Sequence, residues 1–477
     1  MNTTNKNLKL VSVGAGSTYT PDFAEMMIAH QDELPIAEWV LMDIDPYRLE
    51  AVGNFVKKIL QDAAIDIPVR FTTDLVDAVK DADYVISTIR VGGAHARVLD
   101  ETIPPKYGMV GQETTAPGGL AMGLRNVPAI VQIARAIETH AKPNAWLINL
   151  ANPGGMLTEA VYRYSNCKAV GLCNWPSMAW KMTAEAFDVG QKDVFLQFVG
   201  LNHLNWAKIF VHGEDVSEKA KTLLPQKLGE QMGMSGAMSK FFLSRDLIDA
   251  IGWPFAVMYC RYYYMMDEMV EGGDAYDQMN KTMLDMVSQQ LPEDVLAEVD
   301  LSKLHSRAEF VELIDKITIE LYRKLDMSGF RLVQGTRGGA GYGAAGLDVM
   351  RAMVNNSNEV QIIDYPNSGS IADIPRECVV QIPCLINGAG VWPLAMGKME
   401  RHMHALVNSA KQYEILTIEA AMEGDYRKAL EALMASPLEN SFKNSRAVLD
   451  ELLIAHEEYL PNFKEAIRKI KNAERPY

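Results

Sequence analysis

The start of the chain decides the fold, through the stretch Leu8-Lys9-Leu10-Val11-Ser12-Val13-Gly14-Ala15-Gly16-Ser17-Thr18. Its first six residues form an apolar run typical of a buried strand, and two closely spaced glycines follow. Pro21 then stands near the start of a helical pattern, where proline is favoured. A second apolar run covers Trp39 to Asp43. The pattern predicts a strand, a tight turn, a helix and a parallel strand, which together form a βαβ unit.

Further apolar runs extend this arrangement, at Tyr84–Thr88, Trp146–Leu150 and Ala169–Cys173. Their alternation with helical patterns predicts an α/β fold with a doubly wound parallel sheet. After about residue 200 the pattern changes to longer helices and short strands, so we expect an N-terminal domain over residues 1–200 and a mixed α+β domain over residues 201–477. In the second part the pattern predicts helices at Asp246–Met269, Leu304–Leu325, Ala405–Glu423, Tyr426–Met434 and Ser445–Lys471, and a strand at Val379–Ile382.

Composition excludes several classes of protein. The chain has 477 residues, a formal charge of −15 and five scattered cysteines. A strongly acidic protein repels polyanions, so nucleic acid is not expected as a partner. The sequence has no apolar tract long enough to span a bilayer, and the cysteine pattern is not that of a disulfide framework. The polar start at Met1 to Lys9 is unlike a secretory signal, so we do not expect export. We therefore expect a cytoplasmic protein that does not bind membranes.

The glycine turn indicates a dinucleotide site. Gly14 and Gly16, followed by Ser17 and Thr18, allow backbone amides to approach a pyrophosphate at the start of a helix. The third glycine of the usual fingerprint is missing, so a plain strand-to-helix turn is an alternative. Asp43, at the end of the next strand, can accept hydrogen bonds from both hydroxyls of an adenosine ribose, which favours NAD over NADP. The alternative role for Asp43 is that of a helix N-cap.

Polar clusters follow several of the predicted strands, and they occur in a recognisable order. They include Ile89-Arg90-Val91-Gly92-Gly93, Gly111-Gln112-Glu113-Thr114, Asn149-Leu150-Ala151-Asn152-Pro153, Gly171-Leu172-Cys173-Asn174, Gly200-Leu201-Asn202-His203, Tyr259-Cys260-Arg261-Tyr262-Tyr263 and Asp364-Tyr365-Pro366-Asn367. In this order the clusters resemble the signature of the family 4 glycoside hydrolases over most of the chain. The resemblance implies a Rossmann-like domain related to lactate and malate dehydrogenases, bound NAD, a divalent metal that is usually manganese, and cytosolic homodimers or homotetramers.

The resemblance also implies roles for individual residues. Cys173 and His203 match the metal ligands of the family, and a thiolate with an imidazole is a chemically sensible pair. The alternatives are a core cysteine and a hydrogen-bonded histidine. Tyr259 matches the catalytic base, whereas Tyr262 and Tyr263 fit an aromatic packing stripe. A tyrosine acts as a base only if a nearby cation stabilises its phenolate, and Arg261 or the metal could do so.

The implied reaction differs from that of glycosidases with two carboxylates. NAD oxidises carbon 3 of the sugar, Tyr259 removes the proton on carbon 2, the aglycone leaves by elimination, and water and the hydride return. Glu113 matches an acidic residue near the metal and the reacting carbons, with a solvated carboxylate as the alternative. Arg97 and Asn152 match positions that contact the substrate, although a surface arginine and a turn cap are the alternatives.

Asn174 resembles the residue of the family's 6-phospho-β-glucosidases, whereas the α-specific members carry an aspartate that protonates the leaving oxygen. We therefore expect a β-glucoside as substrate. The Thr-Arg pair that binds the sugar phosphate is absent from Glu271–Met283, where Lys281 is the nearby cation. A 6-phospho-α-glucoside and a non-phosphorylated glycoside thus remain alternatives, as do a hydroxy-acid dehydrogenase with His203 as its base and a non-catalytic NAD sensor.

Overall fold

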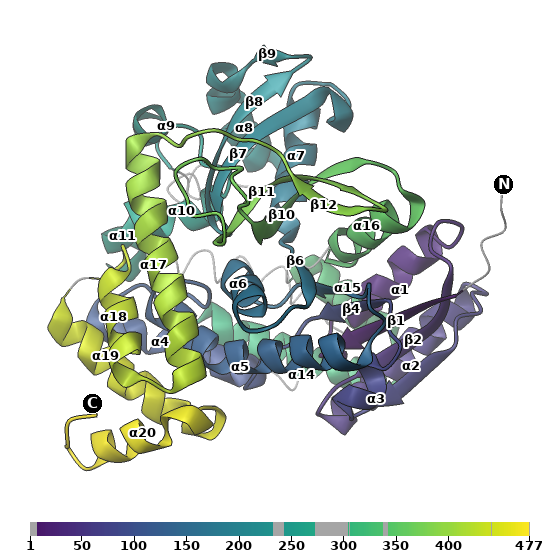
Figure 1. Ribbon diagram of the computed structural model, residues 1–477, viewed down its shortest axis with the longest axis horizontal. Coiled ribbons are helices and arrows are strands. Elements are labelled where there is room, and N and C mark those ends of the chain that lie inside the picture. Colours follow the sequence, from purple (N-terminus) through teal and green to yellow (C-terminus); the bar gives the residue numbers. More distant parts are fainter. Residues whose placement is uncertain are drawn as a thin grey trace.

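One large sheet dominates the computed structural model, which describes residues 7–231, 243–271, 304, 306–336, 342–439 and 441–476 (Figure 1). Six strands of this sheet run parallel in the spatial order β3-β2-β1-β4-β5-β6. They are β1 (Leu8–Val13), β2 (Ile36–Met42), β3 (Val69–Thr72), β4 (Tyr84–Ser87), β5 (Trp146–Asn149) and β6 (Lys168–Gly171). This is the strand order of the dinucleotide-binding Rossmann fold, so the predicted fold class is confirmed.

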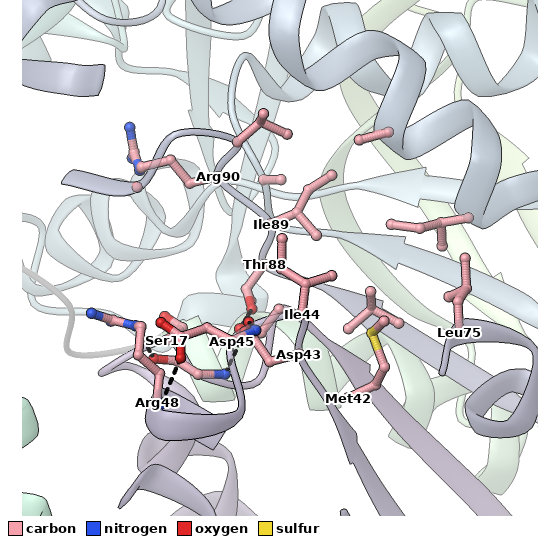
Figure 2. Close-up of a pocket in the computed structure, with 18 of the residues that line it drawn as sticks. Ser17, Met42, Asp43, Ile44, Asp45, Arg48, Leu75, Thr88, Ile89 and Arg90 are labelled. Carbon is pink, nitrogen blue, oxygen red and sulfur yellow. Dashed lines mark hydrogen bonds between the residues drawn. The ribbon is translucent and has the colours of Figure 1, made fainter. Parts of the chain in front are cut away.

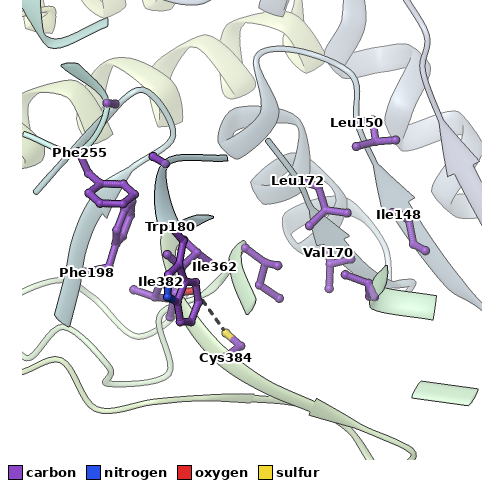
Figure 3. Close-up of a cluster of buried hydrophobic side chains, with 14 of the residues drawn as sticks. Ile148, Leu150, Val170, Leu172, Trp180, Phe198, Phe255, Ile362, Ile382 and Cys384 are labelled. Carbon is purple, nitrogen blue, oxygen red and sulfur yellow. Dashed lines mark hydrogen bonds between the residues drawn. The ribbon is translucent and has the colours of Figure 1, made fainter. Parts of the chain in front are cut away.

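Both faces of the sheet are buried, because alternate residues of each strand enter two different hydrophobic clusters. Ile148 and Val170 belong to the cluster that Figure 3 shows, together with side chains of α1 (Thr20–Ala29), α2 (Pro46–Asp62), α7 (Asn174–Ala186) and α16 (Tyr342–Asn355). Leu147 and Ala169 belong to the opposite cluster, with α3 (Leu75–Val79), α5 (Ala116–His140) and α6 (Gly154–Tyr164). Strands buried on both faces read as continuous apolar runs, which is why the sequence indicated them.

Three strands from the C-terminal half extend the sheet. They are β10 (Glu359–Pro366), β11 (Val379–Asn387) and β12 (Gly390–Pro393), and β10 joins β6 in antiparallel orientation at the pair Asp364 and Gly171. The predicted strand at Val379–Ile382 is the first part of β11. Both predicted segments therefore contribute to one sheet, and the predicted boundary at residue 200 falls within β7 (Val194–Leu201). The division into two domains stays a prediction.

A hairpin that the sequence did not indicate stands above β10–β12 in Figure 1. It consists of β7 (Val194–Leu201) and β8 (Leu204–Val211), with β9 (Glu214–Asp215) at its edge. Phe198 of β7 packs edge to face on Phe255, with ring centroids 5.5 Å apart (Figure 3). Aromatic pairs of this geometry stabilise a core beyond their buried area. Gln197 of β7 also donates a hydrogen bond of 2.8 Å to the carbonyl of Met396, and His203 in the turn of the hairpin lies 3.8 Å from Cys173, which follows β6.

Two predicted helices are interrupted. The stretch Asp246–Met269 contains three helices, α9 (Arg245–Ile251), α10 (Val257–Tyr264) and α11 (Met266–Glu271). Gly252, at φ +78°, and Pro254 lie between the first two, and neither conformation continues a helix. Ser445–Lys471 contains α19 (Phe442–Ala455) and α20 (Lys464–Lys471), separated by short 3-10 turns that include Pro461. A single continuous helix was wrong in both places, because periodicity was weighed above these local breakers.

The remaining helices follow the predicted pattern more closely. The predicted helix Leu304–Leu325 is α14 (Arg307–Arg323), and Ala405–Glu423 and Tyr426–Met434 are α17 (Arg401–Glu423) and α18 (Tyr426–Ala435). The others are α4 (Gly93–Thr102), α8 (Ser217–Gln231) and α15 (Met327–Thr336). None of the helices in the described part of the chain is long and apolar enough to cross a membrane.

Candidate active site

A cleft of about 1120 Å³ opens at the carboxyl ends of β1, β2 and β4. Its wall includes the glycine turn after β1, the start of α2 and the loop after β4. In Figure 2, Ser17, Asp43 and Arg48 form one group, and Arg90 lies apart from them beyond Thr88 and Ile89. The order of the strands reverses between β1 and β4, and ligands of open α/β sheets bind at such a switch point.

The turn requires glycine at both positions, because neighbouring atoms lie too close to leave room for a Cβ. Gly14 has φ +86°, and a Cβ there would lie 2.9 Å from the backbone nitrogen of Ile89. At Gly16 a Cβ would lie 2.8 Å from Asp43 Oδ2. A larger residue at either position would therefore move the loop after β4 or the Asp43 carboxylate. Glycine at these two positions is thus needed for the close packing of the turn against Ile89 and Asp43, and the predicted approach of the turn to a pyrophosphate stays a prediction.

Asp43 lies at the edge of the cleft with a fixed orientation. Its Oδ2 accepts a hydrogen bond of 2.7 Å from Gly16 N and its Oδ1 one of 3.0 Å from Asp45 N. The helix N-cap is Asp45, whose side chain accepts from the backbone of Tyr47 and Arg48. Burial raises the pKa of Asp43, partly offset by those two backbone bonds. The cap role that the sequence left open for Asp43 thus belongs to its neighbour, and Asp43 remains available to a ribose.

Ser17 and Thr18 lie differently. Ser17 lines the cleft, whereas Thr18 is 1% exposed and donates a hydrogen bond of 3.2 Å to Asp315 Oδ1. Asp315 belongs to α14 and also binds Arg48, with Nη1 to Oδ2 at 2.7 Å. Arg48 Nε in turn donates to the carbonyl of Gly16 at 3.0 Å. Helix α14 therefore holds the glycine turn in place through the bonds of Asp315 to Thr18 and Arg48. No sequence motif indicated this role.

The tautomer of His203 follows from its neighbours. Gln112 Oε1 accepts from the backbone nitrogens of Thr114 and Thr115, and also from the Thr114 hydroxyl at 2.7 Å. That hydroxyl has one proton, so it accepts from His203 Nδ1, which lies 2.9 Å away. Burial lowers the pKa of His203 to about 3, and the ring is neutral. Nε2 is therefore the unprotonated nitrogen, and its lone pair points away from Thr114.

That lone pair belongs to the atom nearest the predicted thiol ligand. Cys173 Sγ lies 3.8 Å from His203 Nε2. Two such ligands on one tetrahedral metal stand about 3.5 Å apart, given the usual metal–sulfur and metal–nitrogen bonds. Burial raises the pKa of the Cys173 thiol to about 12, so a bound cation is needed for the thiolate to form. The pair fits a metal, and no third His, Cys, Asp or Glu of the described residues completes a cluster with them.

Tyr259 lies against the same histidine. Its ring stacks on His203 with centroids 3.6 Å apart and planes 2° from parallel. Burial raises the pKa of Tyr259, and the nearby charge of Arg307, at the start of α14, opposes that rise. Arg261, the cation that the sequence suggested for this task, instead lies over the ring of Tyr262. The packing role predicted for Tyr262 fits its burial at 8% exposure.

Glu113 connects the metal-ligand pair to the cleft. It forms ion pairs with Arg90 and, at 3.4 Å, with Arg97, whose Nε is also 2.7 Å from Glu101. Burial opposes ionisation, but the two arginines hold the pKa of Glu113 well below its usual range. Arg90, Arg97 and Asn152 line the cleft. The predicted substrate residues thus stand where the nucleotide cleft meets the reacting groups.

Asn174 is the first residue of α7 and directly follows Cys173, so it is half-buried at the edge of the same group. The segment that bears on the phosphate question, Glu271–Met283 with Lys281, lies outside the described residues apart from the backbone of Glu271. Arg90, Gln112 and Thr114 were missed as functional residues. They stood within the quoted clusters, and only the folded contacts distinguish them from their neighbours.

Comparison with known proteins identifies the family. Residues 9–189 match the family 4 glycosyl hydrolase model and residues 198–439 match the model of its C-terminal domain. A Bacillus subtilis (strain 168) protein named "Probable 6-phospho-beta-glucosidase" is 37% identical over 96% of this chain and 98% of its own length. The 6-phospho-β-glucosidase of Escherichia coli (strain K12) is 32% identical over 98% and 99%.

A solved structure shows the same likeness. The 6-phospho-β-glucosidase of Thermotoga maritima, crystallised with manganese, NAD+ and glucose-6-phosphate, is 31% identical, with a TM-score of 0.80 over 95% of this chain and 99% of that one. The similarity extends over nearly the whole of each chain, and both family models match. The chain therefore belongs to the family 4 glycosyl hydrolases.

Proposed function

We propose that this chain hydrolyses 6-phosphorylated β-glucosides and uses NAD and a divalent metal, with manganese the first candidate. The observation that carries the proposal is the fixed tautomer of His203. Its Nδ1 is held by Thr114, so its Nε2 lone pair is presented to the same space as Cys173 Sγ. This arrangement has no use in a glycosidase that works with two carboxylates, and it suits an enzyme that needs a metal.

Bound NAD and metal would supply oxidation at carbon 3 of the sugar and polarisation of the resulting ketone. The chain's own residues do the rest. Asp43 binds the adenosine ribose of the cofactor, and Gly14, Gly16 and Ser17 bind its pyrophosphate. Thr18, which the sequence also suggested as a cofactor contact, is buried against Asp315 and holds the turn in place instead. Cys173 and His203 hold the metal. Tyr259 removes the proton on carbon 2, in a position fixed by its stack on His203.

Three residues position the sugar. Arg97 and Asn152 line the cleft at its junction with the reacting groups and can donate hydrogen bonds to sugar hydroxyls. Glu113 is held ionised by Arg90 and Arg97, so it can accept hydrogen bonds from those hydroxyls. Asn174 cannot protonate a leaving oxygen, which supports β-linked over α-linked substrates. The Bacillus subtilis and Escherichia coli relatives, 37% and 32% identical to this chain, are both named 6-phospho-β-glucosidases, and relatives named for α-linked substrates, 28% and 27% identical, also carry a phosphate in their names, which supports a 6-phosphate on the substrate.

A panel of nitrophenyl α- and β-glucosides, each with and without a 6-phosphate, tests the proposal in the presence of NAD and Mn2+. We expect the 6-phospho-β-glucoside to have the highest kcat/KM. In heavy water its glucose-6-phosphate product should carry deuterium at carbon 2, because the proton taken by Tyr259 exchanges with solvent. Preference for an α-linked or non-phosphorylated substrate would overturn the specificity. Net NADH formation from a 2-hydroxy acid, without hydrolysis, would instead favour the dehydrogenase.

We also propose that the enzyme works in the cytoplasm as a homodimer or homotetramer. All five cysteines are free, which fits a reducing compartment. Light scattering on the purified protein should give a mass of two or four chains. A monomer that is fully active at nanomolar concentration would contradict this part of the proposal.

A further inference from the structure

We infer that Asn205 is a positioning residue for the reacting groups, an inference that rests on the proposed function. Asn205 lies on β8, two residues after His203, and is 1% exposed. Its side-chain amide bonds to the hairpin that carries His203 and also to the segment that begins the helix of Tyr259. A single amide thus fixes how the metal ligand and the catalytic base stand relative to each other.

The first contact closes the hairpin turn. Asn205 Nδ2 donates a hydrogen bond of 3.1 Å to the carbonyl of Leu201, the last residue of β7. Between the two strands, His203 has φ +66°, in the left-handed region that residues other than glycine rarely adopt. Such a conformation persists where the surroundings hold it. The amide bond spans this turn and so holds the ring of His203 where Thr114 and Cys173 meet it.

The second contact fixes the start of α10. Asn205 Oδ1 accepts a hydrogen bond of 2.9 Å from Ala256 N, and the main-chain carbonyl of Asn205 accepts one of 3.1 Å from Phe255 N. Ala256 immediately precedes α10, which carries Tyr259. Ala256 N is certainly a donor, so the amide cannot be turned over. Its orientation is determined by the backbone.

The third contact connects this pair of elements to the large sheet. Gln381 Oε1 accepts from Asn205 Nδ2 at 2.9 Å, and Gln381 Nε2 donates to Asp364 Oδ1 at 3.1 Å. Gln381 lies on β11 and is 1% exposed, and Asp364 lies on β10 and is fully buried. A buried amide that loses its hydrogen-bond partner keeps the full free-energy cost of its desolvation. Asn205, Gln381 and Asp364 therefore fix one another's positions.

The consequence concerns the stack of His203 on Tyr259, whose planes are 2° from parallel. The two rings come from different elements, and both elements are tied to one Asn205 side chain. Some residues do not touch a metal but fix the orientation of one of its ligands. Removing such a residue lowers metal affinity or activity by about 10–100-fold. The alternative is that the amide stabilises the fold without any influence on the reacting groups.

The test compares Asn205→Leu, which removes all three side-chain bonds, with Asn367→Leu as the control. Asn367 is also fully buried, and its Nδ2 donates to the carbonyls of Ile371 and Ile374. Those bonds lie within the loop that follows β10, and among the described residues this loop forms no hydrogen bond or ring contact with His203 or Tyr259, so the control measures the loss of stability alone. Mn2+ affinity by electron paramagnetic resonance, NAD affinity by calorimetry, kcat, KM and the melting temperature are measured for both.

We expect Asn205→Leu to weaken Mn2+ binding and lower kcat by about 10–100-fold, with NAD affinity and KM changed less than about threefold. Asn367→Leu should lower the melting temperature to a similar extent and leave kcat and Mn2+ affinity near the wild type. Equal loss of kcat in both variants, or wild-type Mn2+ affinity in Asn205→Leu, would overturn the inference.

If Asn205→Leu does not fold, Asn205→Asp replaces it, because the carboxylate keeps the acceptor for Ala256 N and loses the donors to Leu201 and Gln381. The same pattern at smaller size is expected, and wild-type Mn2+ affinity and kcat in that variant would overturn the inference. The binding measurement separates this inference from the proposed function. If the wild-type protein binds Mn2+ and NAD but hydrolyses no glycoside, the proposed function is wrong. The Mn2+ affinities of the variants would still show whether Asn205 positions the metal ligand.

Discussion

In the proposed mechanism, the hydroxyl of Tyr259 is the group that removes the proton on carbon 2. Tyr259→Phe keeps the ring and its stack on His203, so we expect NAD and Mn2+ affinity to stay within about twofold while kcat falls by about 10²–10⁴. Tyr262→Phe is the control, since Tyr262 lies in the same helix and packs edge to face on Tyr259 at 6.4 Å. Unchanged kcat in Tyr259→Phe would exclude it as the base.

A substitution at Cys173 tests whether Cys173 and His203 bind a metal, because it replaces only the sulfur atom. Cys173→Ser keeps the size of the side chain but offers a hydroxyl that rarely ionises, so Mn2+ affinity should fall by at least about tenfold and turnover should be lost. NAD binding should persist, because the glycine turn is a separate part of the cleft. Cys167→Ser is the control, because Cys167 is also a free cysteine, is buried, and stands at the opposite end of β6 from Cys173. Turnover that survives removal of all divalent ions would contradict this role.

Asn174 tests the anomeric preference. An aspartate at this position could donate a proton to a departing oxygen, so Asn174→Asp should raise kcat/KM on α-linked disaccharide phosphates relative to nitrophenyl substrates with good leaving groups. The ratio of the two values, measured across pH 5–8, reports the change. If the unmodified protein already prefers phosphorylated maltose, the inference from Asn174 is wrong.

At the scale of elements, α14 connects the two halves of the site. Arg307 at its first turn places a positive charge near Glu113 and Tyr259, and Asp315 two turns later binds Arg48 and Thr18 at the glycine turn. Tyr322, further along, donates a hydrogen bond of 3.0 Å to the carbonyl of Thr18. One rigid helix therefore fixes the separation between the nucleotide turn and the reacting groups.

Removing the charge of Asp315 should change cofactor selectivity. In Asp315→Asn the Arg48 guanidinium loses its carboxylate partner beside Asp43, and an arginine at that place can accommodate a 2′-phosphate. We expect weaker NAD binding and a smaller preference for NAD over NADP, both measured by calorimetry. Glu320→Gln is the control, because Glu320 lies on the same helix, is half exposed and binds Tyr47 instead. An unchanged ratio of the two dissociation constants would contradict the prediction.

Sequence patterns predicted some elements and missed others for physical reasons. The strands β1, β4, β5 and β6 are buried on both faces over most of their length, so each is predominantly apolar. The β7–β8 hairpin was missed because its strands mix aromatic, apolar and polar residues without a clear period. The glycine turn and Asp43 could be predicted because local backbone geometry requires them. The clamp of Asp315 on Arg48 could not, because its partners are 267 positions apart in sequence and only the tertiary fold brings them together.

At the scale of the whole molecule, Asp364 links stability to pH. Burial, with a smaller contribution from Glu414, raises the pKa of Asp364 to about 7. The folded protein thus binds this proton more tightly than the unfolded chain, whose aspartates titrate near 3.9. The resulting stabilisation is complete below about pH 4 and is lost as the pH rises through about 7.

Asp364→Asn should remove that dependence, since the amide keeps an acceptor for Gln381 and has no charge. We expect the free energy of unfolding of the wild type, taken relative to that of the variant, to fall between pH 5 and pH 7.5. Urea unfolding at several pH values measures it, and the other titrating groups cancel in the difference. Parallel curves for the two proteins would show that Asp364 is ionised throughout.

The antiparallel pairing of β10 with β6 also has a consequence for biosynthesis. The partners Gly171 and Asp364 are about 190 positions apart, and a ribosome adds about 5–20 residues per second. The outer edge of β6 is therefore without its partner for about 10–40 s after it leaves the exit tunnel. A bare strand edge is a template for pairing with other chains, so during this interval the nascent polypeptide is most exposed to aggregation and most in need of a chaperone.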